Sequence, residues 1–194
     1  MQQTWAALIR AKVGSDSNPS MSAAPGRYKI ANALMLKAAW LCCVLGGIYY
    51  GLPALGAMFV LSFWQRELVG DLPFVIALGL IGLCLDTFWM YAGVLDYGDA
   101  ALNLAPGLNI APAWIVMLWL AVGLSIRHSL IFLVNRPVLG ALLVGGGAPL
   151  SYLTGESFGA VVIPSVQGLV VLALTWVVLF FFVFSRAKSR LTAE

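Results

Sequence analysis

Hydrophobic residues fall into six long blocks along the chain, separated by short polar gaps. The blocks cover residues 30–48, 52–64, 72–95, 111–134, 137–153 and 158–185. A transmembrane helix needs about 20 mostly apolar residues, because each residue adds about 1.5 Å along the helix axis. Blocks 52–64 and 137–153 are shorter than the other four. The pattern predicts an all-α, polytopic membrane bundle of six transmembrane helices, with the second and fifth helices short.

The distribution of basic residues orients these helices. Gaps 49–51, 96–110 and 154–157 contain no Lys or Arg, whereas the gaps and tails that alternate with them each contain at least one. Lys and Arg in short loops are retained on the cytoplasmic side of a membrane. The alternation therefore predicts a multi-pass protein of the bacterial inner membrane with both termini in the cytoplasm.

Composition supports a membrane protein and limits its partners. The chain is 61% hydrophobic and 10% charged, against about 25% charged in ordinary soluble domains. Its net charge of +3 lies in short flanks, so no nucleic-acid surface is expected. The basic flanks favour contact with anionic membrane lipids. A membrane protein partner and a second copy of the chain are further candidates.

The chain divides into three segments. Residues 1–28 are rich in Ser, Pro, Ala and Gly, which predicts a disordered cytoplasmic tail. Residues 29–186 form the predicted six-helix transmembrane domain, and residues 187–194 form a basic cytoplasmic tail. Met1 and Met21 are both candidate start residues.

The two short blocks begin with similar sequences. Pro53 and Pro137 each open a Pro-x-Leu-Gly-Ala-x-x-Val pattern. Short helices at equivalent places in two inverted halves are typical of transporter folds. One interpretation is therefore a 3+3 inverted repeat; the other is that this pattern recurs by chance in apolar sequence.

The fifth block contains residues that weaken helices in its middle. Gly145, Gly146, Gly147 and Pro149 lie there, and Pro removes one backbone hydrogen bond. One interpretation is a helix break that offers backbone groups to a ligand. The other is a glycine face that lets a neighbouring helix pack closely.

Asp86 is the clearest candidate for a functional side chain. It lies inside the third block, where burying a charge costs about 2.5–3.5 kcal/mol on insertion scales. Gly79, Gly82 and Gly93 share its helical face, which predicts a tight helix interface. Asp86 is therefore either a proton-coupling or ligand-binding carboxylate, or the acceptor of a structural hydrogen bond from a hydroxyl or indole group.

A second polar group lies near the cytoplasmic end of the fourth block. On a helix, Ser125, His128 and Ser129 would share a face. His128 is the only histidine, and it is either functional or a hydrogen-bonded packing residue. Asn32 and Lys37 lie near the same depth and could contact a lipid headgroup, although Lys37 could instead extend to the membrane surface.

Aromatic residues supply the remaining candidates. Trp119 lies deep in the fourth block and could line a lipophilic cavity or pack in the core. Tyr152 lies near the outer end of the fifth block. The sequence has no nucleotide-binding loop, no Gly-x-Ser-x-Gly motif and no paired metal ligands, so no catalytic residue, metal or cofactor is predicted.

Several short motifs resemble a bacterial membrane family, domain of unknown function 2878. They are Leu85-Asp86-Thr87, Gly93-Val94-Leu95, Pro112-Ala113-Trp114, Leu118-Trp119, His128-Ser129-Leu130, Gly147-Ala148-Pro149-Leu150-Ser151-Tyr152 and Gly159-Ala160-Val161. The resemblance covers about residues 30–185 and departs at Arg127, where the family pattern has Asn. It implies a compact inner-membrane protein without an established activity, and it favours lipophilic substrates because family members accompany lipid-modifying enzymes.

The leading hypothesis is a protein that binds and translocates a lipid or another lipophilic small molecule. Asp86 would be its buried carboxylate, the fifth helix would line the path, and Tyr152 would lie near the outer mouth. His128 and Asn32 would form the inner polar end. The alternatives are a scaffold or assembly subunit of a lipid-modifying complex, and an intramembrane lipid-modifying enzyme.

Overall fold

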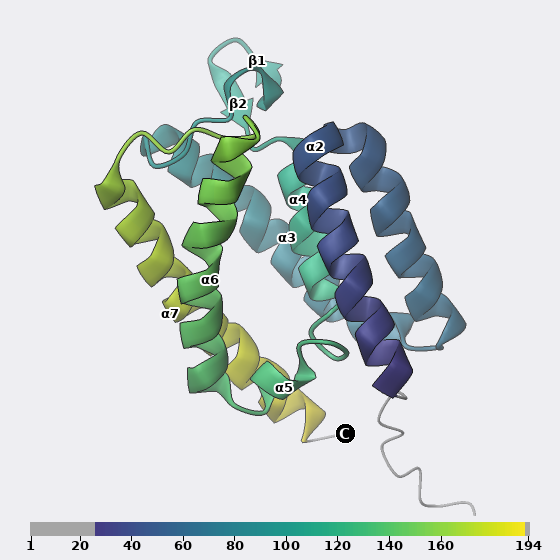
Figure 1. Cartoon of the computed structure of the whole chain (residues 1–194). Helices are drawn as coiled ribbons and strands as arrows, with labels where there is room; N and C mark the ends of the chain where they lie inside the picture. Colours follow the sequence, from purple (N-terminus) through teal and green to yellow (C-terminus); the bar gives the residue numbers. More distant parts are fainter. Residues whose placement is uncertain (1–25, 193–194) are drawn as a thin grey trace, which may run out of the picture.

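The computed structural model describes residues 26–192, which form a bundle of helices with a short β-hairpin at one end (Figure 1). Residues 1–25 and 193–194, which include most of the predicted disordered tail, lie outside the described residues. The helices are α2 (Gly26–Trp64), α3 (Leu68–Tyr91), α4 (Ala113–Gly123), α5 (Ile131–Val134), α6 (Pro137–Ser157) and α7 (Val166–Leu191). A 3-10 helix, η1 (Gly98–Ala100), precedes antiparallel strands β1 (Leu102–Ala105) and β2 (Leu108–Ile110).

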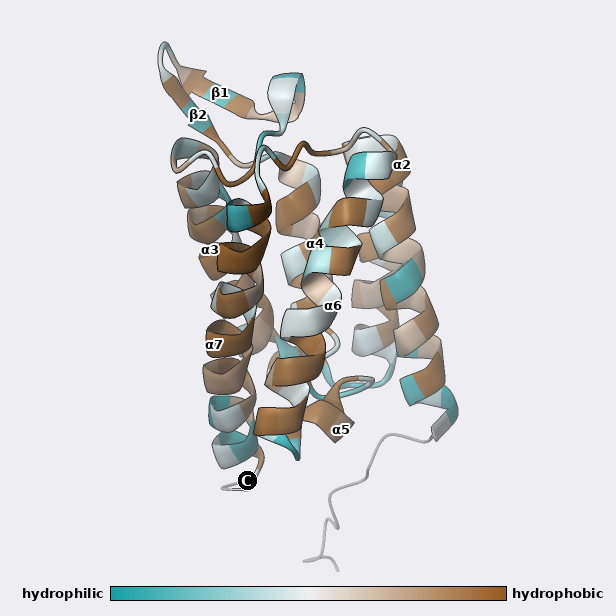
Figure 2. Cartoon of the chain, turned by 60° about the vertical axis from the view of Figure 1, so that its left-hand side comes forward, coloured by the Kyte–Doolittle hydropathy of each residue, from teal (hydrophilic) through white to brown (hydrophobic). Residues whose placement is uncertain are grey.

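The helices have the lengths and surfaces of membrane-spanning segments. In the described part of the chain, α2, α3, α6 and α7 are long and apolar enough to cross a membrane, and α4 is a shorter apolar helix. Large apolar side chains point outward, among them Leu80, Leu174 and Phe182, each at least 60% exposed. Figure 2 shows α7 hydrophobic along its middle and hydrophilic at its C-terminal end. The predicted helical membrane bundle is confirmed.

Helix α2 consists of two arms that meet at Gly47. Gly47 has φ 54° and ψ −135°, a conformation that only glycine adopts without strain. The chain reverses there, and the second arm returns beside the first (Figure 1). A Cβ atom on Gly51 would lie 2.6 Å from Cys43 Sγ, so glycine also permits the close approach of the arms. The two arms correspond to the first two predicted hydrophobic blocks.

The fourth hydrophobic block is not one long helix, contrary to the prediction. Helix α4 ends at Gly123, and turns occupy residues 124–130 before α5 begins. Gly123 lies against the backbone of α3, because a Cβ atom there would be 2.6 Å from Val75 Cα. The freed Leu124 carbonyl accepts a hydrogen bond from Asn32 Nδ2 at 3.1 Å. A partner on α2 therefore replaces the helical hydrogen bond that the chain gives up.

The turns also alter the predicted arrangement of the polar residues in this block. Ser125, His128 and Ser129 lie in the turns and not on one helical face. The Ser125 hydroxyl donates to the Ala121 carbonyl at 2.9 Å, and the Leu130 N–H donates to the Ser125 carbonyl at 3.0 Å. Local bonds of this kind hold the turns before α5, at the end of the bundle opposite the β-hairpin.

Helix α6 is neither short nor broken, so both of those predictions are wrong. It runs for 21 residues and continues through Gly145, Gly146, Gly147 and Pro149. A Cβ atom on Gly145 would clash with Val177 Cγ2 and lie 3.2 Å from the Ala173 carbonyl oxygen of α7. The close packing of α7 supports α6 where Pro149 removes one hydrogen bond. The alternative interpretation, a glycine face for helix packing, is confirmed at Gly145.

The ends of the bundle differ from the predicted boundaries. Helix α2 begins at Gly26, inside the predicted tail, and α7 continues to Leu191, through most of the basic C-terminal segment. Both ends lie at the same end of the bundle, opposite the β-hairpin (Figure 1). The hairpin lies in the gap 96–110, for which the hydrophobic pattern predicts no element. An isolated β-bridge joins Asp96 to Val162 and ties the two loops of that end together.

Candidate functional site

Three side chains converge on Asp86, which is fully buried in α3. Its Oδ1 accepts hydrogen bonds from the Tyr97 hydroxyl at 2.6 Å and the Tyr152 hydroxyl at 3.2 Å. Its Oδ2 accepts one from Trp119 Nε1 at 2.7 Å. We call Asp86, Tyr97, Trp119 and Tyr152 the outer cluster. It joins α3, the loop before η1, α4 and α6 through one carboxyl group.

Glycines on α3 make room for the outer cluster. A Cβ atom on Gly82 would clash with the Trp119 ring, and one on Gly79 would lie 2.5 Å from Leu120 Cδ2. The predicted tight interface on the face of Asp86 is therefore confirmed for these two glycines, whereas Gly93 lies beyond the end of α3. The predicted structural role of Asp86, as acceptor of hydroxyl and indole hydrogen bonds, matches the geometry. Proton coupling and ligand binding by Asp86 stay predictions.

Burial also fixes the donor role of Tyr97, which lies outside the membrane-spanning helices. Burial raises the pKa of the Tyr97 hydroxyl well above 10.0, and the neighbouring phenol of Tyr152 and carboxyl of Asp86 raise it further. The hydroxyl therefore stays protonated at neutral pH and donates a hydrogen bond to Asp86 Oδ1. The cluster depends on a residue in a loop as well as on residues in helices.

A second buried carboxyl group, that of Asp71, lies at the other end of α3. Asp71 Oδ2 accepts a hydrogen bond from Ser62 Oγ at 2.7 Å and lies 2.8 Å from His128 Nε2. Arg127 Nη1 lies 3.2 Å from Glu67 Oε2 and 3.6 Å from Asp71 Oδ1. We call Ser62, Glu67, Asp71, Arg127 and His128 the inner cluster.

Further polar and aromatic contacts surround the inner cluster. Ser129 Oγ donates to Asn32 Oδ1 at 2.6 Å, and the Tyr28 ring meets the His128 ring edge-on at 4.8 Å between centroids. Among residues 26–192, His128 Nδ1 and the Tyr28 hydroxyl are buried without a hydrogen-bond partner. The Ser62 hydroxyl donates to Asp71 and not to the histidine.

The predicted site residues fall into these two groups. Asp86, Trp119 and Tyr152 meet in the outer cluster. His128 belongs to the inner cluster, and the Asn32–Ser129 pair lies beside it. The structure places Asp86 and His128 in separate clusters. Within the described chain, no three His, Cys, Asp or Glu side chains are grouped to hold a metal ion.

Asp71 was missed by the sequence analysis. It falls in the gap before the third hydrophobic block, yet it lies in the first turn of α3 and is fully buried. The signal that could have identified Asp71 is its spacing from the buried residues that follow it on α3. Asp71, Val75 and Leu78 follow an i, i+4, i+7 pattern, which continues to Asp86 and marks the buried face.

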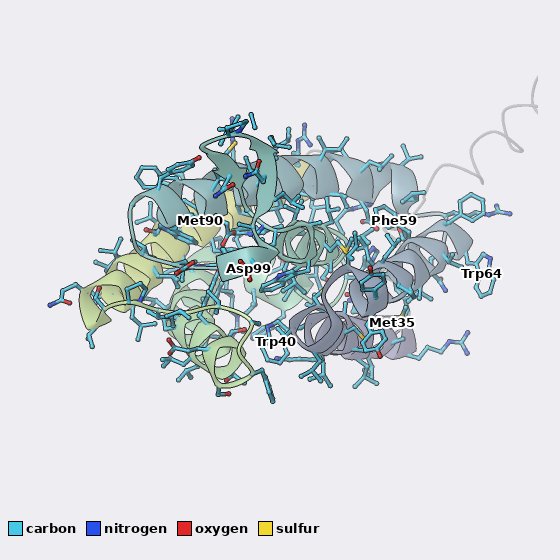
Figure 3. All side chains as sticks on the ribbon, turned by 90° about the horizontal axis from the view of Figure 1, so that it is seen from above. Met35, Trp40, Phe59, Trp64, Met90 and Asp99 are labelled. Atoms are coloured by element: carbon cyan, nitrogen blue, oxygen red, sulfur yellow. The ribbon has the colours of Figure 1, made fainter. Side chains whose placement is uncertain are left out.

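A cleft lies between α2, α4, α6 and α7 and has a volume of about 590 Å³. Its aromatic wall consists of Trp40, Trp114, Trp119, Tyr152, Trp176 and Phe180. Figure 3 shows Trp40 of α2 extending toward α6. Trp119 stacks on Trp176 with 4.7 Å between ring centroids, and Trp176 stacks on Phe180 at 5.1 Å. Trp119 and Tyr152 belong both to the cleft wall and to the outer cluster.

Comparison with known proteins identifies the family of the chain and no activity. No curated protein and no solved structure matches it. The model of one family, described as a protein of unknown function (DUF2878), matches residues 29–182. These residues include every side chain that lines the cleft, both buried aspartates and His128. The resemblance inferred from the short motifs is thereby confirmed, and the chain belongs to the DUF2878 family.

Proposed function

We propose that this protein binds a lipid or another lipophilic small molecule in the cleft and translocates it across the membrane. The observation that carries the proposal is the cleft itself, walled by aromatic and aliphatic side chains from four helices. Its volume of about 590 Å³ falls within the usual range for small-molecule pockets, about 300–1,000 Å³. Its polar groups are few, as expected for a site that holds an apolar ligand in one orientation.

In this proposal the outer cluster controls the shape of the wall. Trp119 and Tyr152 are held by Asp86, so a change at the carboxyl group would move two wall residues together. Asp86 would also couple translocation to a proton. If Asp86→Asn translocated lipid at the wild-type rate, proton coupling would be excluded, and Asp86 would only position these rings. Asn32, Ser129 and His128 would form the polar inner end of the path.

We further propose that the chain crosses the inner membrane six times with both termini in the cytoplasm. The bend at Gly47 supports two crossings by α2. The start of α2 and the end of α7 lie at the same end of the bundle, which supports an even number of crossings. Accessibility of single cysteines to an impermeant thiol reagent in intact cells tests this arrangement. Labelling of position 104 in β1 but not of position 190 in α7 is expected. The 3+3 inverted repeat stays a prediction.

Two neighbouring glycines of α6 provide a matched test of the cleft. Gly147 lines the cleft and Gly146 does not, and a Cβ atom on either would meet nothing within 4 Å. Gly147→Leu should therefore fill the cleft without disturbing the fold, and Gly146→Leu serves as the control. Lipids that copurify in nanodiscs would be identified by mass spectrometry, and translocation would be followed in proteoliposomes.

The expected result is one lipid class enriched over bulk membrane in the wild type and in Gly146→Leu. Gly147→Leu should lose both that enrichment and translocation. Equal, unselective lipid in all three proteins, with no translocation above empty vesicles, would reject the proposal and favour a scaffold role.

A further inference from the structure

The cleft wall contains one side chain with a formal charge, Lys37 of α2. Lys37 is exposed, and within residues 26–192 it forms no ion pair and no side-chain hydrogen bond. The other wall residues are apolar, glycine or uncharged polar side chains such as Ser151 and Thr154. The cleft therefore presents a single cation to any ligand it holds.

The acidic group bonded to the wall residues Trp119 and Tyr152 is not available to that ligand. Asp86 is fully buried, and Trp119 and Tyr152 stand between its carboxyl group and the cleft. Its two oxygens already accept three hydrogen bonds. A cationic headgroup would therefore find no acceptor of opposite charge in the cleft and would meet the Lys37 ammonium group instead.

The position of Lys37 along α2 places this cation well inside the bundle. It lies eleven residues after Gly26, or about 16 Å along a helix. The first arm of α2, from Gly26 to the bend at Gly47, is about 31 Å long, so Lys37 lies near its middle. An unpaired cation at that depth is costly. An anion carried by the ligand would offset the cost.

We propose that the cleft takes a membrane lipid with an anionic, phosphate-bearing headgroup, and that Lys37 pairs with the phosphate midway through the bundle. The inference rests on the proposed function and adds the class of substrate. Zwitterionic lipids with a quaternary ammonium group fit less well, because their cation would approach Lys37. The alternative role of Lys37, reaching the membrane surface with its long side chain, predicts no preference between headgroups.

The test compares translocation of dye-labelled phosphatidylglycerol and phosphatidylcholine in proteoliposomes made with the full chain. The variants are Lys37→Gln, Lys37→Arg and, as a control on the same helix outside the cleft, Lys29→Gln. We expect Lys37→Gln to slow the translocation of phosphatidylglycerol about ten-fold, which is the effect of one charge-assisted hydrogen bond. The translocation rate of phosphatidylcholine should not change. Lys37→Arg and Lys29→Gln should keep the wild-type ratio of the two translocation rates. Should Lys37→Gln elute as aggregate, Lys37→Met replaces it.

Three results would overturn the inference, and they separate it from the proposed function. An unchanged rate for phosphatidylglycerol in Lys37→Gln, with both lipids blocked by Gly147→Leu, would reject the anionic preference and keep the cleft as the path. An equal loss for both lipids in Lys37→Gln would also reject it. Wild-type rates equal to those of protein-free vesicles for both lipids would reject the proposed function and the inference together.

Discussion

The two buried aspartates of α3 share one face of the helix but are held in different ways. Asp86 accepts three hydrogen bonds, all from neutral aromatic donors. Asp71, about 22 Å along the helix, accepts from a serine and lies beside a histidine and an arginine. Asp86 is thus enclosed by aromatic rings, whereas Asp71 belongs to a group of ionisable side chains.

The two clusters also differ in how completely their polar atoms are paired. Every oxygen of Asp86 has a donor, whereas Asp71 Oδ1 accepts no hydrogen bond and lies 3.6 Å from Arg127 Nη1. His128 Nδ1 and the Tyr28 hydroxyl beside it are unpaired as well in the described structure. Fully paired polar networks give rigidity. We infer that the outer cluster fixes the cleft wall.

The largest effect is expected from Asp71→Ala. The substitution leaves His128 and Ser62 without their common acceptor and leaves Arg127 with Glu67 alone. Removing one partner of a buried ionic group typically costs about 3–5 kcal/mol. The free energy of unfolding in mixed micelles, followed by circular dichroism, should fall by that amount. Asp99→Ala, at an exposed position in η1, is the control and should change little. A loss below about 1 kcal/mol for Asp71→Ala would show that the inner cluster resembles a surface ion pair.

A smaller effect is expected from Gly82→Ala at the outer cluster. The added methyl group clashes with the Trp119 ring, which must move away from Asp86 Oδ2. Overpacking of this kind costs about 1–3 kcal/mol, and the shift should also alter tryptophan fluorescence. Gly56→Ala is the matched control in α2, where a Cβ atom meets nothing within 4 Å. That control should be neutral or stabilising by up to about 1 kcal/mol, because alanine favours the helix. Equal stability of the two variants would contradict a tightly packed outer cluster.

The sequence was sufficient for the helical bundle and for three members of the outer cluster, Asp86, Trp119 and Tyr152, but it did not single out Tyr97. Hydrophobic length predicts the helices, and a carboxyl group in an apolar block is unusual enough to single out Asp86. The partners of Asp86 could not be predicted, because Tyr97, Trp119 and Tyr152 lie 11, 33 and 66 residues away. Only the packing of α3, α4 and α6 determines which aromatic side chains reach the carboxyl group.

Local patterns failed where distant contacts decide the backbone. The hydrophobic block 111–134 has no proline after Pro112, and the polar residues within 125–129 fit the pattern of a continuing helix, yet α4 ends at Gly123 and Asn32 pairs with residues 92 and 97 positions away. The glycines and Pro149 of α6 left a break and a packing face as alternatives, and the structure has a continuous helix that packs against α7 at Gly145. In both places tertiary contacts outweigh local propensity.

The smallest effect distinguishes the members of the outer cluster from one another. Tyr97→Phe removes the shorter hydrogen bond to Asp86 Oδ1, 2.6 Å against 3.2 Å for Tyr152. We expect Tyr97→Phe to lower the free energy of unfolding by about 1 kcal/mol and Tyr152→Phe by less. Tyr49→Phe, at a side chain 85% exposed on α2, is the control.

Combining Tyr97→Phe with Asp86→Asn in a double-mutant cycle measures the interaction energy between the two side chains, because the cycle cancels the effect of each substitution on other contacts. A coupling energy near zero would mean that Tyr97 stabilises the loop through its packing on Trp114, 5.6 Å away between ring centroids. In that case the carboxyl group of Asp86 would be held by α4 and α6 alone, and the loop before η1 would act on the cleft wall only through Trp114.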